Sequence, residues 1–168
     1  MLSAAMKSAT KPSAAGISGE DLLAGMAALD PFFREHAMEN EALGCLAPAV
    51  IDVLASHKVH MMLVPESLGG LAFSPIQAMR VIEQIAWSDA STGWVAMVIS
   101  AGTAMASGFL PDSGVERLFG NPQGSIICGS GAPTGKAVKV EGGYQISGRW
   151  SYGSGIRHAH WDHSGAMM

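Results

Sequence analysis

Residues 148–161 read GRWSYGSGIRHAHW, and the pattern changes within them from strand-like alternation to a glycine-containing turn. Alternation places Trp150 and Tyr152 on one face of a predicted strand, with a serine on the other. The strand then meets Gly153-Ser154-Gly155, where the backbone can take positive φ and approach a ligand closely. These residues suit a flat heteroaromatic cofactor, with its ring against the tyrosine and a ring nitrogen bonded to the serine hydroxyl. The same residue types also occur at ordinary strand ends, and composition alone leaves both interpretations open.

This stretch resembles the start of the β-domain in the acyl-CoA dehydrogenase superfamily, in particular its flavin-dependent monooxygenase branch. There a Gly-Arg-Trp-Ser-aromatic-x-Ser-Gly run is followed by His-Ala-x-Trp, as at residues 148–155 and 158–161 here. The resemblance implies that Ser154 sits at flavin N5 and that Tyr152 lies beside the isoalloxazine ring. It makes Ser154 the candidate catalytic residue, and it adds Gly153 to the residues expected to bind the cofactor.

Two further segments carry the same resemblance. Residues 64–70 look like the Pro-Glu-x-x-Gly-Gly turn between early helices of the family, although a Pro- and Gly-containing loop needs no function. Residues 91–94, Ser-Thr-Gly-Trp, resemble the start of a helix that walls the flavin and substrate pocket, which assigns Trp94 to the substrate pocket. In a helix this apolar, a tryptophan is also an ordinary core residue. The monooxygenases often place a histidine about two turns later, and residues 100–103 contain none, which weakens the oxygenase interpretation.

The glycine-rich segment 129–136 suggests a phosphate loop, but its glycine spacing is wrong and an alanine follows the lysine. A strand is also predicted after it, where a phosphate site needs a helix N-terminus. The resemblance instead implies that Gly129, Ser130 and Gly131 border the flavin. Dehydrogenase members tend to have an aromatic-x-x-Thr-Glu-Pro pattern here, whereas this chain has Cys128 in the aromatic position. That departure disfavours a true acyl-CoA dehydrogenase and suits the monooxygenase branch.

Composition limits the partners and the compartment. The 168 residues are 48% hydrophobic and only 14% charged, with a net charge of −4 and a pI near 5.8, so nucleic acid and anionic membranes are not expected as partners. Cys45 and Cys128 form no CxxC pair and are predicted to be free thiols of a cytoplasmic protein. On a strand His158 and His160 would share a face that His163 would not, so no metal is expected.

The sequence predicts helices first and strands afterwards. Helix signals are a Ser18 start, an Asp30-Pro31 kink or restart with the aspartate as cap, a helix over 48–56, a Ser74 capping box and a helix over 111–119. Residues 90–111 contain no charge, and we expect them to form a helix buried on all sides of a soluble protein and not a membrane span. Predicted strands cover 125–128, 137–140, 144–152 and 161–168.

The predicted fold class is therefore α+β. A flexible tail over 1–17 precedes an all-helical domain over 18–121, and an incomplete antiparallel β-domain of the acyl-CoA dehydrogenase type follows over 122–168. In the family a C-terminal helical domain follows the β-domain. We therefore expect this chain to be a fragment, inactive by itself, of a protein that is a homotetramer when complete.

The resemblance implies a two-component monooxygenase that uses reduced flavin, FAD or FMN, from a separate reductase. Its substrate would be an aromatic or similarly apolar small molecule, and O₂ would supply the new hydroxyl oxygen. Two alternatives stay open. One is an acyl-CoA dehydrogenase, whose carboxylate base the family supplies from its C-terminal domain. The other is an inactive truncated chain that serves as a helical scaffold.

Overall fold

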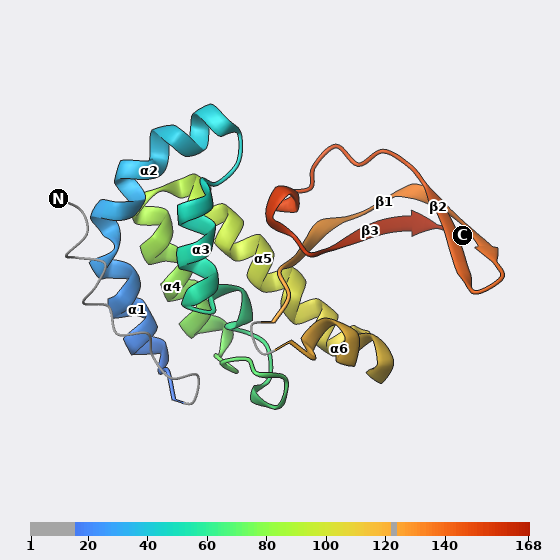
Figure 1. Ribbon diagram of the computed structural model, residues 1–168, viewed down its shortest axis with the longest axis horizontal. Coiled ribbons are helices and arrows are strands. Elements are labelled where there is room, and N and C mark those ends of the chain that lie inside the picture. The colour runs from blue at the N-terminus through green and yellow to red at the C-terminus, as the bar shows by residue number, and fades with distance from the viewer. Residues whose placement is uncertain (1–15, 122–123) are drawn as a thin grey trace.

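The computed structural model describes residues 16–121 and 124–168, so most of the tail expected over 1–17 and the Pro122 boundary lie outside the described residues. Figure 1 shows a body of helices from which a narrow sheet extends. The described helices are α1 (Gly19–Ala28), α2 (Asp30–Leu43), α3 (Pro48–Ser56), α4 (Pro75–Ser88), α5 (Ala90–Phe109) and α6 (Asp112–Phe119). All of them precede the described strands, and the predicted α+β fold class is confirmed.

The sheet differs from the prediction in two ways. Strands β1 (Ile127–Val140), β2 (Gly143–Ser147) and β3 (Trp161–Met167) lie in the order β2-β1-β3. The β1–β2 hairpin is antiparallel as expected, but β1 and β3 are parallel, so the sheet is mixed and the prediction of a purely antiparallel domain was wrong. The reason is the long return after β2, which brings Trp161 back beside Ile127, at the same end of the sheet.

Strand boundaries also differ from the expected ones. The two strands predicted over 125–128 and 137–140 are one long strand, β1, with an irregular register between Ser130 and Gly135. The strand predicted over 144–152 ends at Ser147, which leaves Trp150 and Tyr152 in the return segment. That segment contains the one-turn helix η3 (Ile156–His158) before β3 begins. The stretch that carries the family resemblance is therefore mainly a loop.

The predicted helix starts are confirmed where a side chain supplies the cap. Ser18 and Ser74 both form capping boxes, and Pro75 takes the first position of α4. Asp89 caps α5, because its carboxylate accepts hydrogen bonds from the backbone N–H groups of Ser91 and Thr92. Each cap satisfies backbone donors that the first helical turn leaves without partners. These local contacts fix where α1, α4 and α5 begin.

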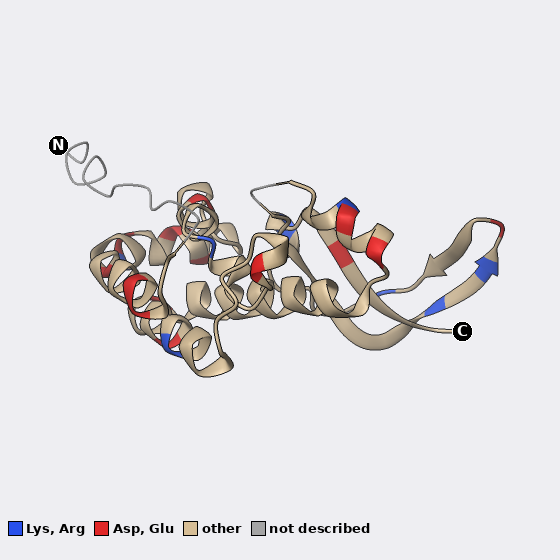
Figure 2. Ribbon diagram, turned by 90° about the horizontal axis from the view of Figure 1, so that it is seen from below, with Lys and Arg blue, Asp and Glu red and all other residues tan. Residues whose placement is uncertain are grey.

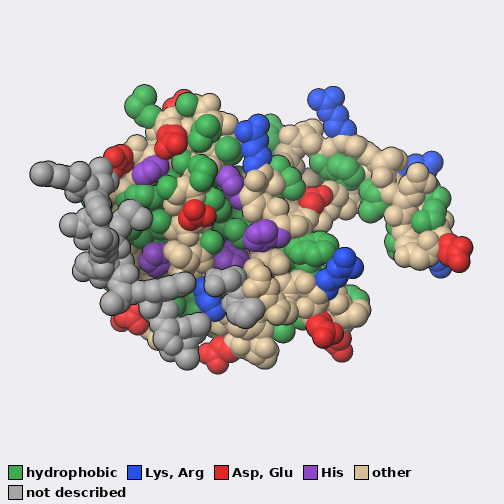
Figure 3. Space-filling model, in the orientation of Figure 1, with side chains coloured by type: hydrophobic (Ala, Val, Ile, Leu, Met, Phe, Trp, Pro, Cys, Tyr) green, Lys and Arg blue, Asp and Glu red, His purple; other side chains and the backbone are tan. Residues whose placement is uncertain are grey.

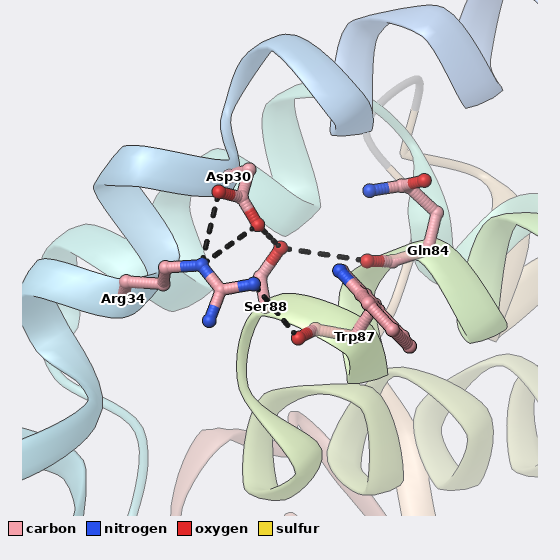
Figure 4. Close-up of polar contacts among 5 residues, drawn as sticks. All are labelled: Asp30, Arg34, Gln84, Trp87 and Ser88. Atoms are coloured by element: carbon pink, nitrogen blue, oxygen red, sulfur yellow. Dashed lines mark hydrogen bonds and ion pairs between the residues drawn. The ribbon is translucent and has the colours of Figure 1, made fainter.

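At Asp30 the chain restarts a helix, but the carboxylate does not cap it. Leu29 is the N-cap of α2, and the Asp30 carboxylate instead accepts hydrogen bonds from Arg34 at 3.0 Å and from the Ser88 hydroxyl at 2.7 Å (Figure 4). Arg34 also donates to the Trp87 carbonyl at 3.1 Å. These contacts hold the pKa of Asp30 below its usual value, with the Arg34 hydrogen bond as the largest cause. They join α2 to the end of α4, just before α5 begins.

Helix α5 is the longest described helix. It was expected to be buried on all sides, and this prediction was wrong, because one face is exposed. It is long and apolar enough to cross a membrane, yet it packs against α4, against η1 (Val59–Met61) and against β1. Its remaining face is open: Trp94 is 57% exposed and Phe109 is 85% exposed. Only 39% of its most apolar window is buried. The contacts place α5 within a folded body and leave an apolar face at its surface.

The main core lies between the first five helices. Its fully buried members include Met26, Phe33, Val50, Leu54, Val81 and Ile85 from α1 to α4, and Ala96 from α5. A smaller cluster joins α6 to the start of β1. Outside these cores the surface is poor in charge: Figure 3 shows many hydrophobic side chains on the visible face, and Figure 2 shows most acidic residues on the helices. The low charged fraction of the sequence is thus visible at the surface.

Candidate functional site

A cleft of about 540 Å³ opens where the loop after β2 meets the helical body. The end of α2 forms one side, the first turns of α5 form another, and the loop over residues 153–158 forms the third. Its lining includes Glu41, Cys45, Trp94, Ser154, Arg157 and His158. The cleft therefore gathers residues from three parts of the chain that are far apart in sequence, and it contains the serine singled out by the motif.

Two predicted site residues meet directly in this cleft. The indole Nε1–H of Trp94 donates a hydrogen bond to the Ser154 Oγ at 2.9 Å. A hydroxyl has one hydrogen and two acceptor lone pairs, so Ser154 keeps its own hydrogen for a further acceptor. Trp94 was expected in the substrate pocket and Ser154 at the cofactor. The structure brings the two together, and Gly153 lines the same cleft.

The loop is fixed to the helical body by two side chains that the sequence did not suggest for this purpose. Arg157 Nη1 donates to the Leu43 carbonyl oxygen at 3.1 Å, and the Leu46 backbone N–H donates to His158 Nε2 at 3.2 Å. Leu43 ends α2, where carbonyl groups lack helical partners and a positive charge is favourable. No local signal reveals these contacts, because the partners lie more than a hundred residues apart.

The histidines of the motif accept backbone hydrogen bonds. Because His158 Nε2 accepts from Leu46, the ring is neutral with its proton on Nδ1. Burial lowers the pKa of His158, and the positive charge of Arg157 lowers it further. His160 Nδ1 accepts from the Ile126 backbone N–H at 2.9 Å. Within residues 16–121 and 124–168 no group of three or more potential metal-ligating side chains is found, and the expectation of no metal stays a prediction.

Gly155 is the glycine that the loop requires. Its φ is +81°, a conformation that side chains disfavour, and a Cβ there would lie 3.2 Å from Ile99 Cγ2 and 3.6 Å from Cys128 Sγ. The backbone thus lies directly on buried side chains of α5 and β1. Cys128 is itself fully buried, and this burial raises the pKa of its thiol to about 11, with a smaller contribution from Asp162. The thiol is therefore held in its neutral, unreactive form.

The other predicted cofactor residues do not line this cleft. Tyr152 is 82% exposed, and Gly129, Ser130 and Gly131 lie along β1. Gly129 has a φ of +155°, and a Cβ there would collide with the His163 carbonyl oxygen of the adjoining strand. Its glycine is thus explained by the close parallel pairing of β1 with β3. The cofactor role of these four residues stays a prediction.

A second, more apolar cleft of about 440 Å³ lies between α5, α6 and β3. Met105, Phe109 and Trp161 contribute to its lining, and the Arg117 guanidinium lies over the Trp161 ring, 5.3 Å from its centroid. The motif over 148–161 ends at Trp161, but its pattern did not indicate this cleft, because the other lining residues come from separate elements. It has no counterpart of the Trp94–Ser154 pair.

Comparison with known proteins agrees with the motifs. The family described as "Acyl-CoA dehydrogenase, N-terminal domain" matches residues 26–112, more than half of the chain. The chain belongs to this family. The family resemblance predicted from the sequence is therefore confirmed.

Within the family, the chain is similar to flavin-dependent monooxygenases. It is 35% identical to indole-3-acetate monooxygenase of Pseudomonas putida over 84% of this chain and 35% of that protein. It is 33% identical to the HsaA oxygenase subunit of a flavin-dependent monooxygenase of Rhodococcus jostii, over 80% of this chain and 35% of that protein. XiaF from Streptomyces, solved with FADH2 and glycerol, superposes with a TM-score of 0.80 at 26% identity. The match covers 86% of this chain and 36% of XiaF. The chain spans about a third of the length of these relatives.

Proposed function

We propose that this chain is part of the oxygenase component of a two-component flavin-dependent monooxygenase, which hydroxylates an aromatic or similarly apolar small molecule. The observation that carries the proposal is the cleft in which the Ser154 hydroxyl meets an aromatic wall. Similarity to proteins named as monooxygenases supports the same reaction class. The short share of each relative that the chain covers makes this a proposal about the larger enzyme.

The residues of the cleft fit a flavin ring system. Ser154 offers a hydroxyl hydrogen for a ring nitrogen that carries no hydrogen, Gly155 removes side-chain bulk, and Trp94 with Val95 gives an apolar wall. A bound reduced flavin would supply the electrons and the reactive centre for O₂ activation. The chain's own tasks would be to orient the ring through Ser154 and to keep water from it with the α5 wall. We propose FAD as the form used, because XiaF is described with FADH2.

The proposal includes the partners and the setting. The R. jostii relative is named an oxygenase subunit, which supports a separate reductase as the source of reduced flavin. Cys45 and Cys128 are both free thiols, which supports a reducing compartment such as the cytoplasm. The exposed apolar residues Trp94 and Phe109 on α5 support burial of this face in an assembly, for which we propose the homotetramer expected from the family.

The test is the ratio of hydroxylated product to hydrogen peroxide when the complete enzyme that contains this chain receives FADH2, O₂ and a phenol or an indole. Product formation is expected, and Ser154→Ala should lower the ratio because the cofactor loses its hydrogen-bond partner. Ser113→Ala, at an exposed position of α6, is the matched control. If Ser154→Ala gives the same ratio as the control, the proposed role of Ser154 is wrong.

One result would favour the dehydrogenase alternative. Oxidised FAD loses its visible absorbance when an acyl-CoA passes a hydride to it, without any reductase. The proposal predicts no such bleaching with an acyl-CoA, and reduction only by NADH together with a flavin reductase. Bleaching by an acyl-CoA alone would overturn the monooxygenase proposal.

A further inference from the structure

The contact between Trp94 and Ser154 points to a second role for the tryptophan. We propose that Trp94 is a positioning residue, whose indole N–H fixes the orientation of the Ser154 hydroxyl and so aims the hydroxyl hydrogen into the cleft. This inference rests on the proposed function, because it concerns the group that would face the cofactor. It differs from a substrate-wall role, in which only the indole ring surface would matter.

The geometry allows Trp94 to act on the hydroxyl alone. The Nε1–Oγ distance of 2.9 Å is that of a good hydrogen bond, and it uses one of the two acceptor sites of the oxygen. In the described part of the chain this is the one hydrogen bond found for the Ser154 side chain. The hydroxyl hydrogen cannot be donated to the indole N–H, so it stays available for a different acceptor.

The loop backbone is held by other residues. Arg157 and His158 bind the end of α2 and the segment after it, at Leu43 and Leu46. Gly155 lies on Ile99 and Cys128 through backbone contact. Removal of the indole N–H should therefore leave the loop in place and free only the serine rotamer.

Trp94 is itself held by a rigid helix start. Thr92 Oγ1 donates to the Asp89 carboxylate at 2.6 Å and accepts from the Asn40 amide at 3.2 Å, which ties this turn to α2. Gly93 packs so closely on Ala86 of α4 that a Cβ would collide with it. The backbone next to Trp94 thus has little freedom. A side chain on such a support can hold a hydroxyl in one orientation.

The first test uses the protein without cofactor. In nitrogen-15 NMR the indole N–H signal of Trp94, assigned by its loss in Trp94→Phe, should shift in Ser154→Ala and exchange faster with solvent. The indole of Trp150, which donates to the Gly165 carbonyl oxygen at 2.9 Å, should not respond and serves as internal reference. A Trp94 signal that is unchanged in Ser154→Ala would overturn the inference whatever the flavin experiments show.

The second test measures the affinity of the complete enzyme that contains this chain for FADH2 under anaerobic conditions. Trp94→Phe keeps the aromatic wall and removes the N–H, and it should weaken binding roughly threefold to tenfold, the range of one hydrogen bond. Trp94→Phe combined with Ser154→Ala should be no weaker than Ser154→Ala alone, because both act through one contact. Trp87→Phe, at a 77% exposed position of α4, is the control and should bind as the unaltered protein does.

The outcomes separate the two proposals. Additive losses in the double variant would mean that Trp94 acts independently of Ser154, and the positioning role would be wrong. If the NMR shift is present but the unaltered protein binds no FADH2, the proposed function fails, and the positioning role fails with it. If FADH2 binds and the NMR shift is absent, only the positioning role fails.

Discussion

Gly102 of α5 lies flush against the carbonyl oxygen of Ile127, the first residue of β1. A Cβ at this position would overlap the carbonyl, so the strand can approach the helix this closely only because residue 102 has no side chain. The contact fixes where the sheet leaves the helical body. Cys128 follows Ile127, and its side chain lies against Gly155 of the cleft loop. The contact between Gly102 and Ile127 therefore also positions the side chain that supports this loop.

Gly102→Ala is therefore expected to lower the free energy of unfolding by about 1–3 kcal/mol, the usual cost of an overpacked core site. Gly108→Ala is the matched control in the same helix, because nothing lies within 4 Å of its added Cβ. The control should raise stability by up to about 1 kcal/mol through helix propensity. Urea unfolding of both variants measures the difference. Equal stabilities would mean that α5 and β1 are not in this close contact.

Stability should depend on pH through His158. Its pKa in the folded protein lies below the ordinary value of 6.5, so the unfolded chain binds the proton more tightly. The stabilising effect of the neutral ring is fully present above about pH 6.5 and is lost as the pH falls below it. Between about pH 7.5 and about pH 5.5, the free energy of unfolding should fall more in the unaltered protein than in His158→Gln. A parallel decrease in both proteins would contradict the neutral acceptor role.

The two cysteines should differ in reactivity. Cys45 is partly exposed in the cleft, whereas Cys128 is fully buried and the pKa of its thiol is raised to about 11. A disulfide-exchange reagent at mildly alkaline pH should label Cys45 in the native protein and label Cys128 only after unfolding. Cys45→Ser should then leave no promptly reactive thiol. Prompt labelling of Cys128 in the native protein would show that the loop at Gly155 moves away from it.

Local chemistry made much of the fold predictable. The capping boxes at Ser18 and Ser74 and the proline at the start of α4 act within one helical turn, so their sequence patterns are sufficient to place helix starts. Asp30 shows the limit of such patterns. Its carboxylate accepts hydrogen bonds from Arg34 and Ser88 and not from the backbone N–H groups of the helix N-terminus. Ser88, 58 residues away, competes with the local cap.

The rest depended on contacts between distant segments. The parallel pairing of β3 with β1 follows from the return of the chain after β2, and strand periodicity carries no information on that direction. For the cleft, the motif indicated Ser154 and Trp94 separately, but their hydrogen bond and the anchors Arg157 and His158 required the assembled fold. Tyr152 was placed on a strand by alternation, which the return segment does not continue.

The most direct test of the central claim is an anaerobic titration of the complete enzyme that contains this chain with FADH2, followed through the nitrogen-15 indole signals. Bound flavin that reaches Ser154 is expected to move the Trp94 N–H signal in a saturable way and to leave that of Trp150 in place. Binding that leaves the Trp94 signal unmoved, or no binding at all, would contradict the claim that this cleft is the flavin site.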